Sequence, residues 1–313
     1  MTAEHVVPEP RAELSVDLAD GRSIGVAEFG PADGRAILWF HGTPGGRRQV
    51  PPAARRLANT EGLRIIGVER PGVGASTAYV HDNVAGWASD IEQVVDALGV
   101  DRFGLIGLSG GGPYVLACSH ELSDRVPGAV VLGGVAPTEG PDAAPGGMMD
   151  LAHRLRLPLG WMQVPLGLSL TALARVLRPI EGPAIDLYAQ ISPDGDRRAF
   201  ESPGMKGMFL DDLGRGAAGV GLMSVAADMV LFTRHWGFSV RDIAVPVRFW
   251  HGDADHMVPL DHARHMVDLM PDAELVVRPD ESHLGTLVVG DDAVRTVLDL
   301  WDRTPAATVA ASL

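Results

Sequence analysis

The sequence predicts an α/β protein with a mostly parallel sheet, and two observations lead to this prediction. Short apolar runs that resemble strands alternate with helix-compatible stretches up to about residue 134, and the alternation resumes at residue 245. Such alternation is typical of parallel sheets, in which a helix connects each strand to the next. The chain has 313 residues, of which 46% are hydrophobic, so it is long enough for a substantial core and one insertion.

Eight strands are expected along the chain. Residues 14–29 alternate like two leading antiparallel strands, and the later apolar runs are expected to form the parallel part of the sheet. These runs are residues 36–40, 64–68, 103–106, 130–134, 245–252 and 273–279, with helices expected near 260–270 and 293–301. From residue 138 to about 236 the pattern changes to helical stretches broken by glycine and proline, such as 171–177 and 220–233.

The sequence GLSGG at residues 107–111 lies between the apolar run at 103–106 and a helix-compatible segment. A GxSxG pattern between a strand and a helix is typical of a nucleophile elbow, in which glycines leave room for a strained backbone and for close passage of the strand and the helix. We therefore expect Ser109 to be a nucleophile, with the amide of Gly110 pointing to the position of a tetrahedral oxyanion. A glycine-rich turn with an incidental serine is the alternative, and the remaining motifs weigh against it.

A serine nucleophile requires a base, which is normally a histidine oriented by a carboxylate, in the chain order serine, acid, histidine. The loop after the strand at 245–252 offers Asp253 and Asp255, and the loop after the strand at 273–279 contains His283. Both loops follow the carboxyl ends of strands, the edge at which open α/β sheets build their sites. An aspartate and His283 can therefore converge on Ser109.

These motifs resemble those of the α/β-hydrolase superfamily, in its serine-nucleophile, esterase- and lipase-like form with a helical cap. The resemblance extends from about residue 14 to residue 301. It implies an α/β-hydrolase fold with helices on both faces of the sheet, and an acid in a GxxDxxxP context, here residues 252–259, which selects Asp255 over Asp253. An acid after the preceding core strand, where the chain offers only Glu139, is disfavoured.

The resemblance also indicates a second oxyanion donor. The segment HGTPGG at residues 41–46 follows the strand at 36–40 and is similar to the family's HGxPG loop, which implies that the amide of Thr43 joins that of Gly110. His41 is implied to support this loop rather than to transfer protons. The RPGVGAS segment at residues 70–76 resembles a turn that shapes the floor of the site.

The domain division implied by the resemblance is a core in two parts, residues 1–137 and 237–303, separated by a helical cap at 138–236 and followed by a tail at 304–313. Methionine side chains are flexible and polarizable, so a pocket roofed by them accommodates varied apolar shapes. This favours a lipophilic acyl or alcohol group beneath the cap, although core packing explains any single methionine equally. The methionines in the cap are Met148, Met149, Met162, Met205, Met208, Met223 and Met229.

The implied activity is cleavage of a carboxylic ester, small to medium and lipophilic, through an acyl-enzyme on Ser109 and without a cofactor. Alternatives are a C–C bond or lactone hydrolase, or a ligand-sensing protein with little turnover. Epoxide hydrolases and haloalkane dehalogenases are disfavoured because they place an aspartate at the elbow. Proline iminopeptidases share the HGxPG loop but carry bulky residues where this chain has Leu108 and Gly110, which makes peptidase activity a minor alternative.

Charge excludes some classes of partner. The net charge of -14 and the sequence pI near 5.1 argue against nucleic-acid binding, so a small-molecule substrate is expected. Residues 157–174 carry no charge, but their glycines and prolines favour a cap helix without stable membrane insertion. A cluster of arginines is expected to be the solvated face of a helix with no assigned partner. These residues are Arg47, Arg48, Arg55 and Arg56.

The cysteine and histidine content completes the expectations. Cys118 is the only cysteine, which excludes an intrachain disulfide and suits a reducing compartment, and we expect a buried thiol. The first residues lack the pattern of a secretory signal, so a cytoplasmic location is expected. No metal site is predicted, because the histidines near residues 251–265 match no known zinc spacing.

Overall fold

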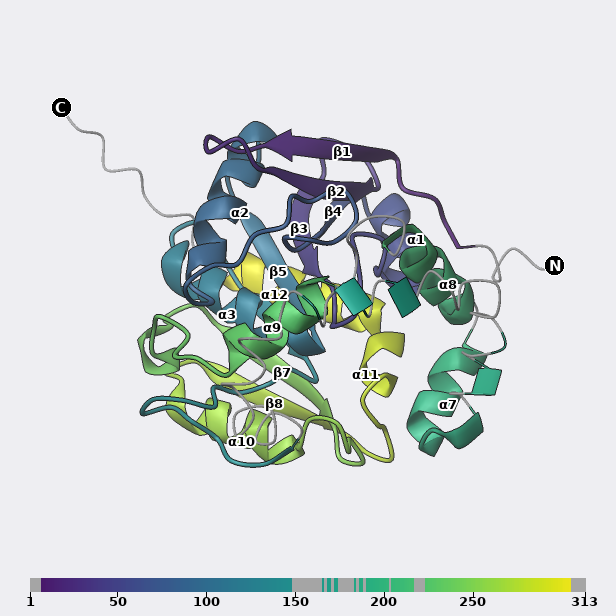
Figure 1. The fold of residues 1–313 in the computed structure, drawn as a ribbon, viewed down its shortest axis with the longest axis vertical. Helices are drawn as coiled ribbons and strands as arrows, with labels where there is room; N and C mark the ends of the chain where they lie inside the picture. Colours follow the sequence, from purple (N-terminus) through teal and green to yellow (C-terminus); the bar gives the residue numbers. More distant parts are fainter. Residues whose placement is uncertain are drawn as a thin grey trace.

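The computed structural model describes residues 7–147, 165, 168–169, 172–173, 183, 186–187, 190–202, 204–216 and 223–304. Its centre is a sheet of eight strands in the order β1-β2-β4-β3-β5-β6-β7-β8 (Figure 1). The strands are β1 (Ala12–Asp17), β2 (Ser23–Phe29), β3 (Arg35–Phe40), β4 (Leu63–Val68), β5 (Phe103–Leu108), β6 (Ala129–Leu132), β7 (Val247–Gly252) and β8 (Ala273–Arg278).

The sheet is antiparallel at one edge and parallel elsewhere. β2 pairs in antiparallel fashion with both β1 and β4, whereas β4, β3, β5, β6, β7 and β8 pair in parallel. β3 lies between β4 and β5, so that Leu38 is opposite Ile66 on one side and Leu105 on the other. The predicted fold class, with two leading antiparallel strands and a mostly parallel sheet, is therefore confirmed.

Helices cover both faces of the sheet. Successive residues of a strand point to opposite sides, so each strand contributes to a core cluster on each face. Leu38 and Phe40 belong to one core cluster, whereas Ile37 and Trp39 belong to the other. The first cluster is completed mainly by α2 (Gly86–Ala97), α3 (Gly112–Glu121) and α10 (Leu260–Leu269). The second is completed mainly by α1 (Pro52–Thr60) and α12 (Gly290–Arg303), and the short α11 (Gly285–Val288) precedes α12.

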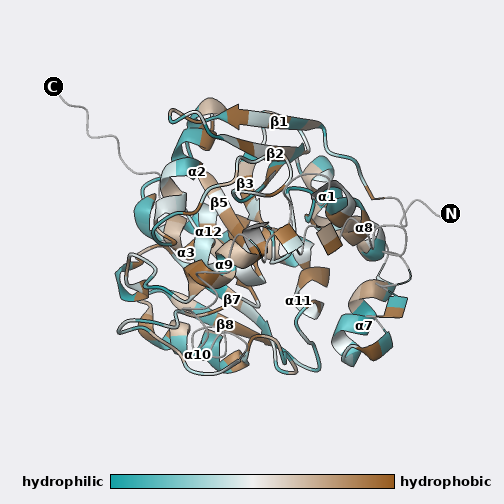
Figure 2. Ribbon diagram, in the orientation of Figure 1, coloured by the Kyte–Doolittle hydropathy of each residue, from teal (hydrophilic) through white to brown (hydrophobic). Residues whose placement is uncertain are grey.

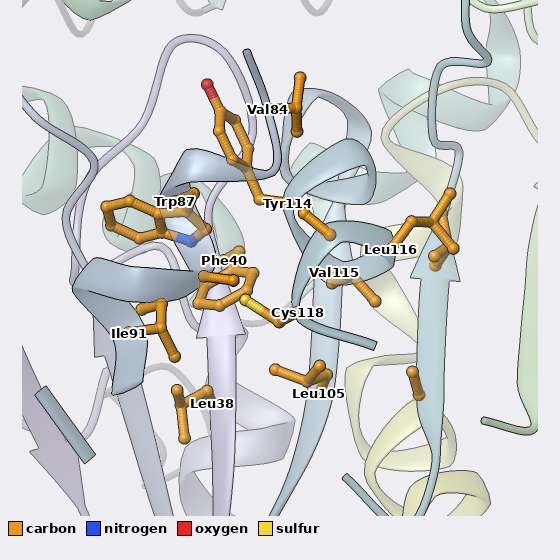
Figure 3. Close-up of a cluster of buried hydrophobic side chains, with 14 of the residues drawn as sticks. Leu38, Phe40, Val84, Trp87, Ile91, Leu105, Tyr114, Val115, Leu116 and Cys118 are labelled. Carbon is orange, nitrogen blue, oxygen red and sulfur yellow. The ribbon is translucent and has the colours of Figure 1, made fainter. Parts of the chain in front are cut away.

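Figure 3 shows the first cluster between β3, α2 and α3. Phe40 faces Trp87 edge-on, with ring centroids 5.9 Å apart, and the sulfur of Cys118 lies among these apolar side chains. Cys118 is a free, buried cysteine, and burial raises the pKa of its thiol well above the ordinary value. The expectation of a buried thiol is confirmed. Figure 2 shows the whole fold by hydropathy, with hydrophobic residues along β5 inside the molecule and hydrophilic residues on α2.

Three described helices lie in the chain between β6 and β7, and we call them the insert helices: α7 (Asp194–Glu201), α8 (Met205–Gly216) and α9 (Met223–Phe232). α9 was predicted within residues 220–233. α7 packs against α11 and α8, and α8 contributes Met205 and Met208 to the second core cluster. These two methionines therefore pack as core. The boundaries at residues 137 and 236 stay a prediction.

Some predictions fall outside the described residues. They include most of the uncharged segment 157–174, most of the helix expected at 171–177, the methionines Met148, Met149 and Met162, and the tail beyond residue 304. Among the residues that are described, no helix is both long enough and apolar enough to cross a membrane.

Candidate active site

Ser109 lies in the turn between β5 and α3, within a single 3₁₀ turn at Ser109–Gly111. Its φ is +50°, in the left-handed region that residues with a side chain rarely adopt. The neighbouring glycines allow this turn to stay tight. A methyl group on Gly107 would lie 2.6 Å from Cγ2 of Val115 and 2.7 Å from the carbonyl oxygen of Gly111, which is too close. The predicted strand, sharp turn and helix are therefore present around a strained serine.

His283 faces Ser109 from the loop after β8. Its Nε2 lies 2.8 Å from Ser109 Oγ, and its Nδ1 lies 2.8 Å from Asp255 Oδ2. A carboxylate only accepts hydrogen bonds, so Nδ1–H donates to Asp255 and the lone pair of Nε2 faces the serine hydroxyl. The histidine is only 4% exposed. This arrangement orients the imidazole to accept the Ser109 proton.

Asp255 is held in the loop after β7 as an ionised carboxylate. Its Oδ1 accepts the backbone N–H groups of Met257 and Val258, each at 2.9 Å, and its Oδ2 lies 3.4 Å from His251 Nε2. Burial alone would raise the pKa of Asp255, but hydrogen bonds from His251 and His283 outweigh burial and lower this pKa well below the ordinary value. The negative charge therefore persists beside His283.

The two other acids considered from the sequence lie elsewhere. Asp253 is exposed, and its Oδ1 accepts the backbone N–H of Asp280 at 2.8 Å. The φ of Asp280 is +58°. Glu139 is also exposed. The structure thus brings Asp255 to His283, while Asp253 stabilises a turn in the neighbouring loop.

Thr43 and Gly110, the two expected oxyanion donors, lie side by side. Their turns leave β3 and β5, which are adjacent parallel strands with Phe40 opposite Gly107. A methyl group on Gly110 would collide with Thr43 Oγ1 and would lie 3.1 Å from Thr43 Cβ. Thr43 therefore lies beside the turn that contains Ser109.

His41 supports the loop after β3. Its Nδ1 donates to the carbonyl oxygen of Gly42 at 2.7 Å, and its Nε2 accepts the backbone N–H of Arg70 at 3.2 Å. Burial, with the charge of Arg70, lowers the pKa of His41 well below the ordinary value, so the ring is neutral. The ring thus joins the loop after β3 to the loop after β4, as expected of a supporting residue.

Sequence reasoning missed the partners of this loop. Arg70, noted only as part of a turn, is buried and donates through Nη2 to the carbonyl oxygen of Gly42 at 2.9 Å and to Asp228 Oδ2 at 2.8 Å. Asp228 lies on α9 and is also buried. The available signal was a single acid within an apolar helical stretch, because such an acid requires a partner when it is buried.

The expectation that the arginine cluster is a solvated helix face is wrong. Arg47 and Arg48 precede α1, and both Arg48 and Arg55 are buried. Arg55 donates to the carbonyl oxygens of Val50 and Arg48, and its guanidinium lies 4.5 Å from the ring centroid of Phe29. Burial of an arginine is tolerated where carbonyl oxygens occupy its donors.

Several histidines that raised the question of a metal have other contacts. His265 Nε2 donates to the carbonyl oxygen of Asp142 at 3.0 Å, and His262 Nδ1 accepts the backbone N–H of Ala136 at 3.2 Å. In the part of the chain that the structure describes, no three histidine, cysteine or acidic side chains are grouped as metal ligands would be.

Comparison with known proteins identifies the family. Residues 35–288 match the family described as alpha/beta hydrolase fold, and the chain therefore belongs to that family, as its motifs predicted. Membership of this family establishes the α/β-hydrolase fold.

Individual relatives differ in activity. The chain is 30% identical to a proline iminopeptidase from Arabidopsis thaliana over 129 residues, covering 40% of this chain and only 33% of the relative. It is 25% identical to a bifunctional esterase/perhydrolase from Acinetobacter calcoaceticus over 86% of this chain and 92% of the relative. An esterase structure from Rhodococcus sp. ECU1013 is similar with a TM-score of 0.64 and 23% identity, covering 92% of this chain and 99% of that one, and it shows the fold.

Proposed function

We propose that this protein is a serine hydrolase that cleaves carboxylic esters of small-molecule substrates through an acyl-enzyme on Ser109. One observation carries the proposal: Ser109 Oγ, His283 Nε2, His283 Nδ1 and Asp255 Oδ2 form a continuous hydrogen-bonded chain, with both contacts at 2.8 Å. Nucleophile, base and orienting carboxylate within hydrogen-bond reach are the parts that acyl transfer requires.

The reaction proceeds in two steps. His283 Nε2 takes the Ser109 proton as Oγ attacks the ester carbonyl, and Asp255 stabilises the imidazolium that forms. The amides of Thr43 and Gly110 hold the oxyanion, and the alcohol leaves with the proton from Nε2. Water then enters, gives a proton to Nε2 and attacks the acyl carbonyl. As the intermediate collapses, the bond to Oγ breaks, Nε2 returns the proton to Ser109 Oγ, and the carboxylic acid is released.

An aromatic ring beside the serine turn supports a lipophilic substrate. A methyl group on Gly110 would lie 3.3 Å from Cε2 of Phe232, which places this aromatic ring next to the turn. Phe232 ends α9 and packs against Tyr114 with ring centroids 5.7 Å apart. Aromatic rings at this position favour an acyl or alcohol group with apolar character.

The test is hydrolysis of p-nitrophenyl esters of increasing acyl length, together with labelling by a fluorophosphonate. Wild type and Ser89→Ala, a matched change at an exposed serine, should show the same turnover, whereas Ser109→Ala should lose both turnover and label. Retained turnover in Ser109→Ala would refute the assignment of the nucleophile. Labelling of Ser109 without turnover of any ester would refute ester cleavage and favour lactones, C–C bonds or ligand sensing.

A further inference from the structure

Each insert helix carries a buried aspartate that accepts hydrogen bonds from a loop of the candidate site. These residues are Asp196 on α7, Asp212 on α8 and Asp228 on α9, each 2% exposed. A buried carboxylate is unfavourable unless hydrogen bonds satisfy its oxygens. The groups that donate to these three aspartates lie outside the insert helices, in segments around Ser109.

Asp212 holds the backbone of the loop that contains Thr43. Its Oδ2 accepts the N–H of Gly46 at 2.8 Å and its Oδ1 accepts the N–H of Arg48 at 3.0 Å. The two oxygens of one carboxylate thus fix two amides within a few residues of the expected oxyanion donor.

Asp228 connects the same loop to the helix that follows Ser109. Its Oδ2 accepts the hydroxyl of Thr43 at 2.6 Å and Nη2 of Arg70 at 2.8 Å. Its Oδ1 accepts the hydroxyl of Tyr114 at 2.7 Å, and Tyr114 lies on α3. Thr43 and α3, the helix after the serine turn, therefore bind one carboxylate on α9.

Asp196 holds the loop of the proposed base from both sides. Its Oδ1 accepts the hydroxyl of Ser282 and the backbone N–H of Leu284, the latter at 2.6 Å. These residues immediately precede and follow His283. A single oxygen of Asp196 thus fixes both neighbours of the histidine.

We infer that Asp196, Asp212 and Asp228 are positioning residues, through which docking of the insert helices sets the geometry of the His283 loop and of the oxyanion loop. The inference rests on the proposed function, because it assigns these loops their chemical roles. Oxyanion donors act at 2.7–3.1 Å, and misplacement by about 1 Å costs about 100-fold in rate. The insert helices therefore position the loops that carry the reacting groups.

The test measures the rate at which Ser109 reacts with a fluorophosphonate, together with kcat and KM for an ester. Asp196→Ala and Asp212→Ala, which remove the accepting oxygens, should lower the labelling rate and kcat by about 10- to 100-fold, with little change in KM. Asp196→Asn keeps the accepting oxygen and should restore the rate to near that of wild type. Asp194→Asn, at an exposed position of the same helix, is the matched control and should leave the rate unchanged.

Two outcomes overturn the inference: labelling rates within about twofold of wild type in folded Asp196→Ala and Asp212→Ala, or no recovery in Asp196→Asn. Should those variants fail to fold, Thr43→Val decides, because it replaces the hydroxyl that donates to Asp228 and accepts from Arg70 with a methyl group of similar size. A severalfold fall in labelling that Thr43→Ser reverses supports the inference, and an unchanged rate in Thr43→Val overturns it. Labelling requires no ester turnover, so failure of the proposed ester cleavage is read separately.

Discussion

Asp255 divides its carboxylate between two tasks, with Oδ2 2.8 Å from His283 Nδ1 and Oδ1 accepting the backbone N–H groups of Met257 and Val258. The backbone contacts fix the carboxylate in its loop, so the other oxygen points at the imidazole of His283 in one orientation. Changes to this carboxylate therefore act on the tautomer and orientation of His283.

Asp255→Asn should lower kcat by about 1,000- to 10,000-fold, because an amide opposite Nδ1 stabilises the wrong tautomer of His283. Asp253→Asn, two residues away and exposed, should change kcat by less than about twofold. Steady-state kinetics on the best ester distinguishes the two. A larger loss in the Asp253 variant would show that the acid has been assigned to the wrong residue.

Gly110→Ala should disable the site without unfolding the protein. The added methyl group would collide with Thr43 Oγ1 and push apart the two turns that carry the expected oxyanion donors. We expect the labelling rate of Ser109 to fall at least about 100-fold, comparable with loss of one oxyanion donor. Gly207→Ala on α8 would meet only Cγ2 of Val7, at 3.1 Å, and serves as the control. Normal labelling in Gly110→Ala would contradict the proximity of the two turns.

The stability of the protein should depend on pH through Asp212. Burial raises the pKa of this carboxyl from 3.8 to about 7, despite the N–H groups of Gly46 and Arg48 that lower it; Glu69 raises it further and Arg55 lowers it. The folded state therefore binds the proton more tightly than the unfolded state. This contribution to stability is complete below about pH 4 and is lost as pH rises through about 7.

Asp212→Asn provides the reference for that measurement. The free energy of unfolding of wild type minus that of the variant should decrease from pH 4 to 7, by up to about 1.4 kcal/mol per pH unit, and then level off. Urea unfolding at several pH values gives this difference. A difference that increases with pH would mean that the backbone N–H groups outweigh burial, and that Asp212 is fully ionised at neutral pH.

Cys118 should react with thiol reagents only when the protein unfolds. Its side chain is fully buried between α3 and the sheet, and burial raises the pKa of the thiol, so little thiolate is present or accessible (Figure 3). We expect Ellman's reagent to react at least about 100-fold more slowly with the native protein than with the protein in urea. Rapid native reaction accompanied by loss of ester turnover would instead identify a second nucleophile.

The parts of the fold that follow from local sequence were predictable. β4, β5 and β6 are buried along their whole length, so apart from Arg64 in β4 they form apolar runs that are visible in the sequence. Ser109 was identifiable because a tight turn at φ +50° requires neighbouring glycines, and these appear as a short motif. Asp255 was separable from Asp253 only by family resemblance, since both lie in the same loop.

Contacts between distant segments were not predictable. Asp228 and Thr43 are 185 residues apart, and no periodicity of α9 indicates which core loop its carboxylate meets. The same reason explains the wrong expectation for Arg48 and Arg55. Four arginines near one helix look like a charged surface until the carboxylates and carbonyl oxygens that satisfy them arrive from other parts of the chain.

Backbone hydrogen bonds join the loop of Asp255 to the loop of His283. Asp253 N–H donates to the carbonyl oxygen of Arg278 and Ala254 N–H donates to that of Glu281, in addition to the bond between Asp253 Oδ1 and the N–H of Asp280. β7 and β8, which carry these loops, are adjacent, whereas β6 separates them from the strand of Ser109. These bonds therefore hold the Asp255 carboxylate and the His283 imidazole in a fixed relative position. A bend of the sheet at β6 would change the distance of both groups from Ser109 together.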